Sequence, residues 1–331
     1  MGTLAAVELT APPVPESGEA LMPRAETFRE GVIQILSDLL PLLRPDLAEA
    51  LQICICVFAV VMLCALVCGL RENLKPTANL AAAVGAAGLL LRSGSSLIAL
   101  GAATVEELTE YGKLLLPVMS AGMAAQGLPG TSAAIYGATA AVSTILGRCI
   151  ARLFVPMLYV YLALARASAA LGEEMLKGLK ELVKKAVNWA LKTVLTLYIT
   201  YIGITGAVSG TTDAVTLKAT KAVISTFVPM VGGILSDASE AVLVGAGLAK
   251  NAAGIYGIFA ILAVFLGPFL RIGVHCLLLK GTAELCGIFA EKQVTELIRD
   301  FSGAMGLLLG MTGAVCLLLL IGTICFLRGW G

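Results

Sequence analysis

Long stretches with few or no charged residues dominate the chain after residue 50. A helix needs about 20 apolar residues to cross the roughly 30 Å hydrocarbon core of a bilayer. We predict spans at Leu51–Leu70, Ala78–Ala103, Thr131–Gly147, Leu153–Leu171, Thr193–Thr212, Asn251–Leu270, Ile272–Phe289 and Phe301–Leu327. The pattern therefore predicts an all-α, polytopic membrane protein with about seven or eight transmembrane helices.

Residues 1–49 have a different pattern. Several prolines within residues 12–23 favour an extended or irregular start, and residues 25–40 have the apolar spacing of an amphipathic helix. The first 19 residues show no basic region followed by an apolar core, so we expect no signal peptide there and insertion directed by the first span. We divide the rest into two N-terminal transmembrane helices at 50–112 and two membrane units at 113–210 and 211–327.

Two apolar segments, 114–130 and 226–249, contain residues that break helices. We expect a half-helix in each, because backbone that leaves helical geometry at membrane depth must be shielded by protein or line a wet cavity. The candidate pathway residues are Pro117, Gly127 and Pro129 in the first segment, and Pro229, Gly232, Gly233, Asp237 and Glu240 in the second.

Asp237 and Glu240 are three residues apart and so share one helix face. Ionisable groups at membrane depth are costly and usually functional. The alternative is that both carboxylates lie in the interface and are merely solvated.

Short matches within the chain indicate an internal repeat. The strings around Pro117 and Pro229, around Tyr136 and Tyr256, and from Gly203 and Gly310 match in the same order. Each unit would contain a broken half-helix, two spans, an amphipathic connector and a final span. Basic residues do not decide whether the units are inverted or parallel.

The connector at 173–190 has leucines and valines at helical spacing, with lysines on the opposite face. We predict a helix that lies in the membrane interface, where a tryptophan is also favoured. Its candidate interfacial residues are Lys177, Lys180, Lys184, Lys185 and Trp189. A solvated connector is the alternative.

Composition supports the membrane class. Hydrophobic residues make up 58% of the chain, charged residues 14%, and the mean hydropathy is +0.93. A soluble domain is about 25% charged. The net charge of +1 provides no basic face for nucleic acid. This composition implies that membrane lipid surrounds the chain.

Catalytic and metal-binding motifs are absent from the sequence. There is no phosphate-binding loop, no zinc-protease motif and no nucleophile elbow, and the single imidazole, His275, adjoins Cys276 in an apolar stretch. The nine cysteines lie mostly within apolar runs, without paired histidines or carboxylates that would complete a metal site. We therefore expect no catalytic residues, no cofactor and no metal.

Residues 207–257 carry a more specific pattern, in which polar residues and glycines interrupt apolar sequence. Four stretches resemble the stage III sporulation protein AE family of endospore-forming bacteria: Ala207–Lys218, Lys221–Gly233, Ser236–Ala238 and Lys250–Gly254. The resemblance extends over about residues 113–327. Members often begin with a signal sequence, and this chain departs from that pattern.

The resemblance implies a role that composition does not show. The family belongs to a secretion-like channel complex between mother cell and forespore, in the mother-cell membrane around the forespore. The implied partners are the other stage III sporulation A-operon proteins, including the ATPase-like AA member, and stage II sporulation protein Q. A homo-oligomer is also possible. The alternative function is a two-repeat secondary transporter for an ion or small solute.

Overall fold

Helices make up the fold throughout the part of the chain that the structure describes. The computed structural model describes residues 12–23, 28–70, 75–125, 127–171, 174–208 and 252–328. The helices are α1 (Glu16–Glu19), α2 (Phe28–Leu70), α3 (Lys75–Ala125), α4 (Pro129–Cys149), the π-helix η2 (Ile150–Phe154), α5 (Val155–Leu171), α6 (Glu174–Val208), α9 (Ala252–Cys286) and α10 (Lys292–Arg328). Six stretches among these residues are long and apolar enough to cross a membrane. The all-α polytopic class is confirmed.

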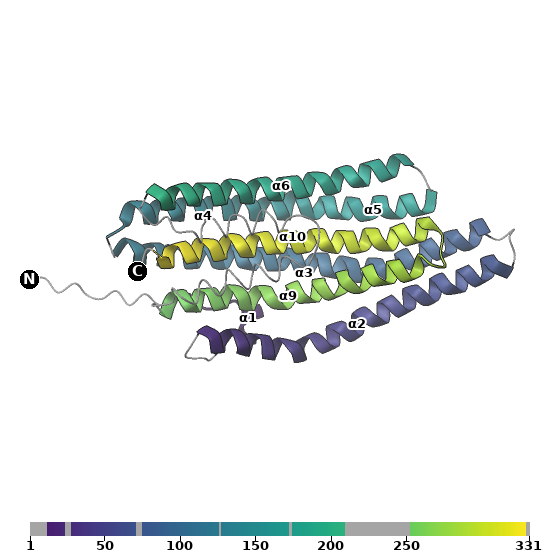
Figure 1. The fold of residues 1–331 in the computed structure, drawn as a ribbon, viewed down its shortest axis with the longest axis horizontal. Helices are drawn as coiled ribbons and strands as arrows, with labels where there is room; N and C mark the ends of the chain where they lie inside the picture. Colours follow the sequence, from purple (N-terminus) through teal and green to yellow (C-terminus); the bar gives the residue numbers. More distant parts are fainter. Residues whose placement is uncertain are drawn as a thin grey trace, which may run out of the picture.

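The long helices lie side by side as three antiparallel hairpins (Figure 1). These are α2 with α3, the continuous α4–η2–α5 with α6, and α9 with α10. The helices α2, α5 and α9 all end at the same end of the bundle, on the right in Figure 1, which we call the turn end. The second helices of the hairpins, α3, α6 and α10, therefore run in the same direction.

Helix α10 forms the centre of the bundle and packs against α3, α4, α5, α6 and α9. In its most apolar 18-residue stretch, 78% of the residues are buried. A helix that is apolar on all sides must be enclosed by protein or lipid, and here the other helices enclose it.

Glycines of α3 let α10 approach closely. A Cβ added at Gly101 would lie 2.6 Å from Leu308, and one at Gly112 would lie 2.6 Å from Leu319. The absence of side chains at these two positions leaves room for the leucines. Small residues serve the same purpose where helices pack in membranes.

A buried polar contact joins α4, α6 and α10 within the uncharged part of the bundle. The hydroxyls of Thr139 and Tyr198 lie 3.0 Å apart, and Tyr198 Oη donates to the carbonyl oxygen of Leu318 at 3.3 Å. Because all three residues are fully enclosed, the contact satisfies groups that neither lipid nor water reaches.

Neighbouring predicted spans are joined in the structure, which is why six candidate spans stand where we expected seven or eight. Arg148 and Arg152, which we took to separate two spans, lie in α4 and η2 of one continuous helix, and both are exposed. A charged residue does not end a helix when its side chain can point outward. The π-helix at this point adds a wider turn, a feature that is frequent near functional sites.

The expected break at Pro117 is not seen, because α3 continues through this residue to Ala125. Neighbouring helices allow a proline within a membrane helix by satisfying the freed backbone groups. The expected turn at residues 127–130 is present: Gly127 has φ of 93° and Pro129 is the first residue of α4. Only glycine adopts such a φ without strain, and proline suits a first helical position.

The predicted domain boundaries at 49–50 and 112–113 fall inside α2 and α3. The described helices are instead grouped as the three hairpins. The internal repeat remains a prediction, since part of the second unit lies outside the described residues.

Candidate functional site

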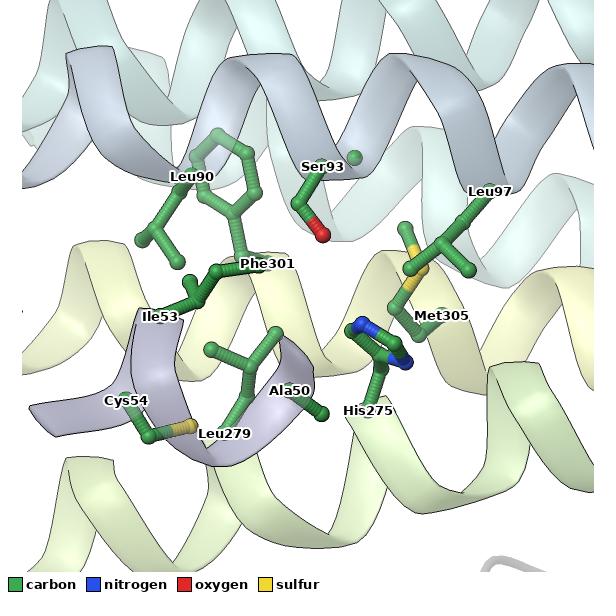
Figure 2. A pocket seen from close by; sticks show the side chains of 11 residues that line it. Ala50, Ile53, Cys54, Leu90, Ser93, Leu97, His275, Leu279, Phe301 and Met305 are labelled. Atoms are coloured by element: carbon green, nitrogen blue, oxygen red, sulfur yellow. The ribbon is translucent and has the colours of Figure 1, made fainter. Parts of the chain in front are cut away.

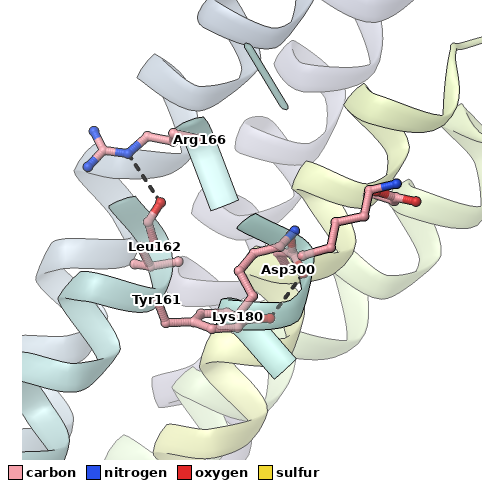
Figure 3. A network of polar contacts seen from close by, with 7 residues as sticks. Tyr161, Leu162, Arg166, Lys180 and Asp300 are labelled. Atoms are coloured by element: carbon pink, nitrogen blue, oxygen red, sulfur yellow. Dashed lines mark hydrogen bonds and ion pairs between the residues drawn. The ribbon is translucent and has the colours of Figure 1, made fainter. Parts of the chain in front are cut away.

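A buried ion pair joins the second and third hairpins near the turn end (Figure 3). Lys180 of α6 donates through Nζ to Oδ2 of Asp300 on α10. Tyr161 of α5 donates from its hydroxyl to the other carboxylate oxygen, Oδ1, at 3.0 Å. Both oxygens of Asp300 are therefore used, and three helices meet at one carboxylate.

The pair is shielded from solvent. The side chain of Lys180 is 7% exposed and that of Asp300 is 18% exposed. Removing two charges from water is costly, and their attraction compensates only when the geometry is good and the remaining polar atoms are satisfied. The hydrogen bond from Tyr161 meets the second requirement, so we take this cluster as the candidate functional site.

Other ion pairs continue from the site around the bundle. Lys177 lies 3.6 Å from Glu296, again between α6 and α10, and Arg299 lies 3.0 Å from Glu284 across the α9–α10 hairpin. These exposed pairs contribute little individually. Together they place charge on the same stretch of α10, ahead of its uncharged part.

Arg271 of α9 binds the first hairpin to the third. Its Nε lies 3.2 Å from Asp46 and its guanidinium 3.3 Å from Glu49, both on α2. These contacts lie farther from the turn end than the site, because Arg271 precedes Cys276, which packs beside Ser302. We call the site and its neighbouring ion pair between α6 and α10 the polar layer: Tyr161, Lys177, Lys180, Glu296 and Asp300.

His275 is buried beside the polar layer and lines a small cavity between the first and third hairpins (Figure 2). Its Nδ1 lies 2.9 Å from the carbonyl oxygen of Arg271, one helical turn earlier. Ser93 of α3 and Phe301 of α10 line the same cavity. Cys276 and Ser302 nearby bond reciprocally, with Ser302 Oγ donating to the Cys276 carbonyl at 2.9 Å. Among the described residues, no three His, Cys, Asp or Glu side chains converge as metal ligands would.

The predicted pathway residues are not brought together with this site. Pro117, Gly127 and Pro129 lie at the opposite end of α3 and at the start of α4. The other five, from the segment 226–249, lie outside the described residues: Pro229, Gly232, Gly233, Asp237 and Glu240.

The predicted interfacial helix is the first half of α6 rather than a separate element. Lys180 does not lie on a solvated face, because it points into the bundle toward Asp300. The remaining predicted residues, Lys177, Lys184, Lys185 and Trp189, are partly or fully exposed. Leu179 and Leu182 are exposed too, so the outward face mixes apolar, lysine and tryptophan side chains.

Sequence reasoning missed Asp300 and Tyr161. The available signal for Asp300 was its place directly before the uncharged stretch that begins at Phe301. Its partner Lys180 lies 120 residues away in the chain, beyond the reach of a local pattern.

Comparison with known proteins agrees with the resemblance found in the sequence. The stage III sporulation protein AE family model matches residues 24–328. The stage III sporulation protein AE of Bacillus subtilis (strain 168) is 24% identical over 186 residues, which are 56% of this chain and 47% of that relative. The matched region thus spans about half the length of the relative. No solved structure matches. Because the family model covers most of the sequence, the chain belongs to the stage III sporulation protein AE family.

Proposed function

We propose that this chain is an integral membrane subunit of the secretion-like channel complex between mother cell and forespore, required for endospore development. Its proposed location is the mother-cell membrane around the forespore. The observation that carries the proposal is the family match over residues 24–328, a range that contains all six candidate spans. The family match therefore covers the membrane bundle, and the role is proposed for that bundle.

The packing supports a subunit that keeps its shape among partners. The buried pair of Lys180 and Asp300 fixes α6 against α10, while Arg271 fixes α2 against α9. The third hairpin is thus tied to the second at one level and to the first at another. A body held in this way can transmit or resist force from a neighbouring protein without its hairpins separating.

The outer face of α6 is suited to the membrane surface. Leu197, Tyr201 and Ile204 are exposed along its uncharged half, and Trp189 and Lys185 are exposed nearer the polar layer. Aromatic and lysine side chains favour the membrane interface, with apolar side chains in the hydrocarbon. The polar layer would then lie at one edge of the bilayer, where partner proteins can reach it.

We further propose that the chain acts without catalytic chemistry of its own. The sequence has no phosphate-binding loop. Energy from ATP would come from the ATPase-like AA member, and the other proposed partners are the remaining stage III sporulation A-operon proteins and stage II sporulation protein Q.

Affinity purification of the tagged full chain from sporulating cells tests the proposal. We expect the other stage III sporulation A-operon proteins to co-purify, and an Asp300→Asn variant to recover less of them at equal protein level. Arg299→Gln, which changes the exposed neighbour of Asp300, is the matched control and should recover the same set as the wild type. Purification of the chain without any of these proteins would contradict the proposal.

A second candidate is a secondary transporter, because an enclosed ion pair such as that of Lys180 and Asp300 can form part of an ion or proton pathway. Purified chain in liposomes distinguishes the two functions. A transporter moves solute or protons alone and loses this flux in Asp300→Asn. A channel subunit shows no flux without its partners.

A further inference from the structure

A second cavity, with a volume of about 280 Å³, lies at the turn end between the first and third hairpins. Its walls come from the second half of α2, the first turns of α3, and the connection from α9 to α10 with the start of α10. The turn end is on the right in Figure 1. Its lining residues are all different from those of the cavity beside His275. Ligand pockets usually measure about 300–1,000 Å³, so this space fits a small chemical group rather than a large molecule.

The lining of this cavity combines polar and apolar groups. Glu291, Asn79 and Cys68 bring a carboxylate, an amide and a thiol to the walls, and Phe289 brings an aromatic ring. The Cys68 thiol donates to Oδ1 of Asn79 at 3.7 Å, which joins α2 to α3. The amide nitrogen of Asn79 is a donor, so the cavity offers both a negative charge and a hydrogen-bond donor to a ligand.

Glu291 determines the charge of a ligand that fits. Its carboxylate forms no ion pair with another described residue, whereas Glu284 and Glu296 nearby pair with Arg299 and Lys177. A carboxylate binds an organic ammonium through charge-assisted hydrogen bonds, and an aromatic ring adds a cation–π contact.

The aromatic ring in the lining can be reached, because Phe289 is 53% exposed. A metal ion is not favoured as the cation, since no three His, Cys, Asp or Glu side chains converge within the described part of the chain. The lining therefore fits an organic ammonium.

The outer side of α2 indicates where such an ammonium comes from. Leu63 is 64% exposed and Leu66 61%, and the most apolar 18-residue stretch of α2 is only 17% buried, so lipid covers this side of the helix. Cys64 and Ala65 lie between these two leucines in the sequence, and both line the cavity. A lipid whose acyl chains lie against the leucines therefore has its head group within reach of the cavity.

We propose that this cavity binds the head group of a zwitterionic membrane lipid, phosphatidylethanolamine. The ammonium contacts the Glu291 carboxylate and the Phe289 ring, and the Asn79 amide donates to the phosphate. The acyl chains follow Leu63 and Leu66 along α2. This inference does not depend on the channel complex proposed above, because it concerns the cavity of a single chain.

Native mass spectrometry of the purified full chain tests the proposal. The chain is titrated with phosphatidylethanolamine and, separately, with phosphatidylglycerol of the same acyl chains, which has no ammonium. We expect the wild type to bind phosphatidylethanolamine about tenfold more tightly, as one charge-assisted hydrogen bond allows. Glu291→Gln should abolish this preference. Glu284→Gln is the matched control and should keep it, since Glu284 is also exposed but does not line the cavity.

Filling the cavity provides the second measurement. Ala65→Leu should reduce phosphatidylethanolamine binding to the level of phosphatidylglycerol, because the longer side chain occupies the space. Ala59→Leu, on an exposed position of α2 outside the lining, should bind as the wild type does.

Three results would overturn the proposal: equal affinity of the wild type for the two lipids, an unchanged preference in Glu291→Gln, or equal binding by Ala65→Leu and Ala59→Leu. Each would leave the proposed function standing, because that function is judged by the proteins that co-purify.

Discussion

Substitution of Asp300 by alanine tests the energetics of the buried ion pair directly. The change removes the carboxylate that Lys180 and Tyr161 share, and leaves the Lys180 ammonium buried with its side chain 7% exposed. Breaking a buried pair from one side costs about 3–5 kcal/mol, because an uncompensated charge remains. Native proteins are stable by roughly 5–15 kcal/mol, so we expect Asp300→Ala to lose a large share of the unfolding free energy.

Two companion variants separate this effect from general damage. The double variant Lys180→Met with Asp300→Leu replaces both charges by apolar side chains, a change that is often neutral or stabilising by about 1–4 kcal/mol. It should therefore be more stable than Asp300→Ala. Glu284→Ala removes the partner of Arg299 in a pair whose side chains are 64% and 55% exposed, and should cost no more than about 1 kcal/mol.

Equilibrium unfolding in mixed micelles, followed by helical circular dichroism as the fraction of denaturing detergent rises, measures all four proteins. The expected order of stability places the double variant and Glu284→Ala near the wild type and Asp300→Ala well below them. If Asp300→Ala unfolded with the wild type, or if the double variant were less stable than the single one, the ion pair would not be buried as described.

Three further predictions concern helix packing, the turn and the polar contact in the uncharged part, and the same unfolding assay checks each. Gly101→Val should lower the unfolding free energy by about 1–3 kcal/mol, because its side chain would overlap Leu308. Adding Leu308→Ala should partly restore stability. If the losses of the two single variants simply added in the double variant, the contact would be refuted. Gly127→Ala should cost about 1–2 kcal/mol, since its φ of 93° is unfavourable for alanine; an unchanged midpoint would refute the positive φ. Tyr198→Phe should lower the unfolding free energy by roughly 0.5–1.5 kcal/mol, because it removes the hydrogen bond to Leu318. If Tyr201→Phe on the exposed face had an equal effect, the hydrogen bond of Tyr198 would not be the cause.

Features that depend on local composition could be predicted from the sequence. Uncharged stretches identified the membrane-crossing regions, and Gly127 with Pro129 identified the turn between α3 and α4. Both inferences rest on properties of the residues themselves, namely hydrophobicity and the allowed range of φ.

The ends of helices within the membrane could not be predicted in the same way. Arg148 and Arg152 interrupt the apolar pattern and so suggested a loop, yet the helix continues because both side chains point away from the bundle. Which way a side chain points depends on the neighbouring helices. That information is not contained in the residues next to it.

The candidate site shows the same limit more strongly. The lysines of residues 177–185 look alike in sequence, and nothing local distinguishes Lys180 from Lys184 or Lys185. Lys180 differs only because the fold brings Asp300 and Tyr161 to it from distant parts of the chain.

The position of α10 has a consequence for how the protein is made. Among the described helices, α10, which the others enclose, is the last to leave the ribosome. Until α10 is inserted, the earlier helices lack the helix against which they pack. They therefore stay separate or only loosely associated in the membrane. A nonsense codon before Lys292 would therefore leave a bundle without its central helix, which quality-control proteases would degrade. The first two hairpins, α2 with α3 and α4–η2–α5 with α6, would nevertheless have been inserted as complete pairs, and only α9 would lack its partner.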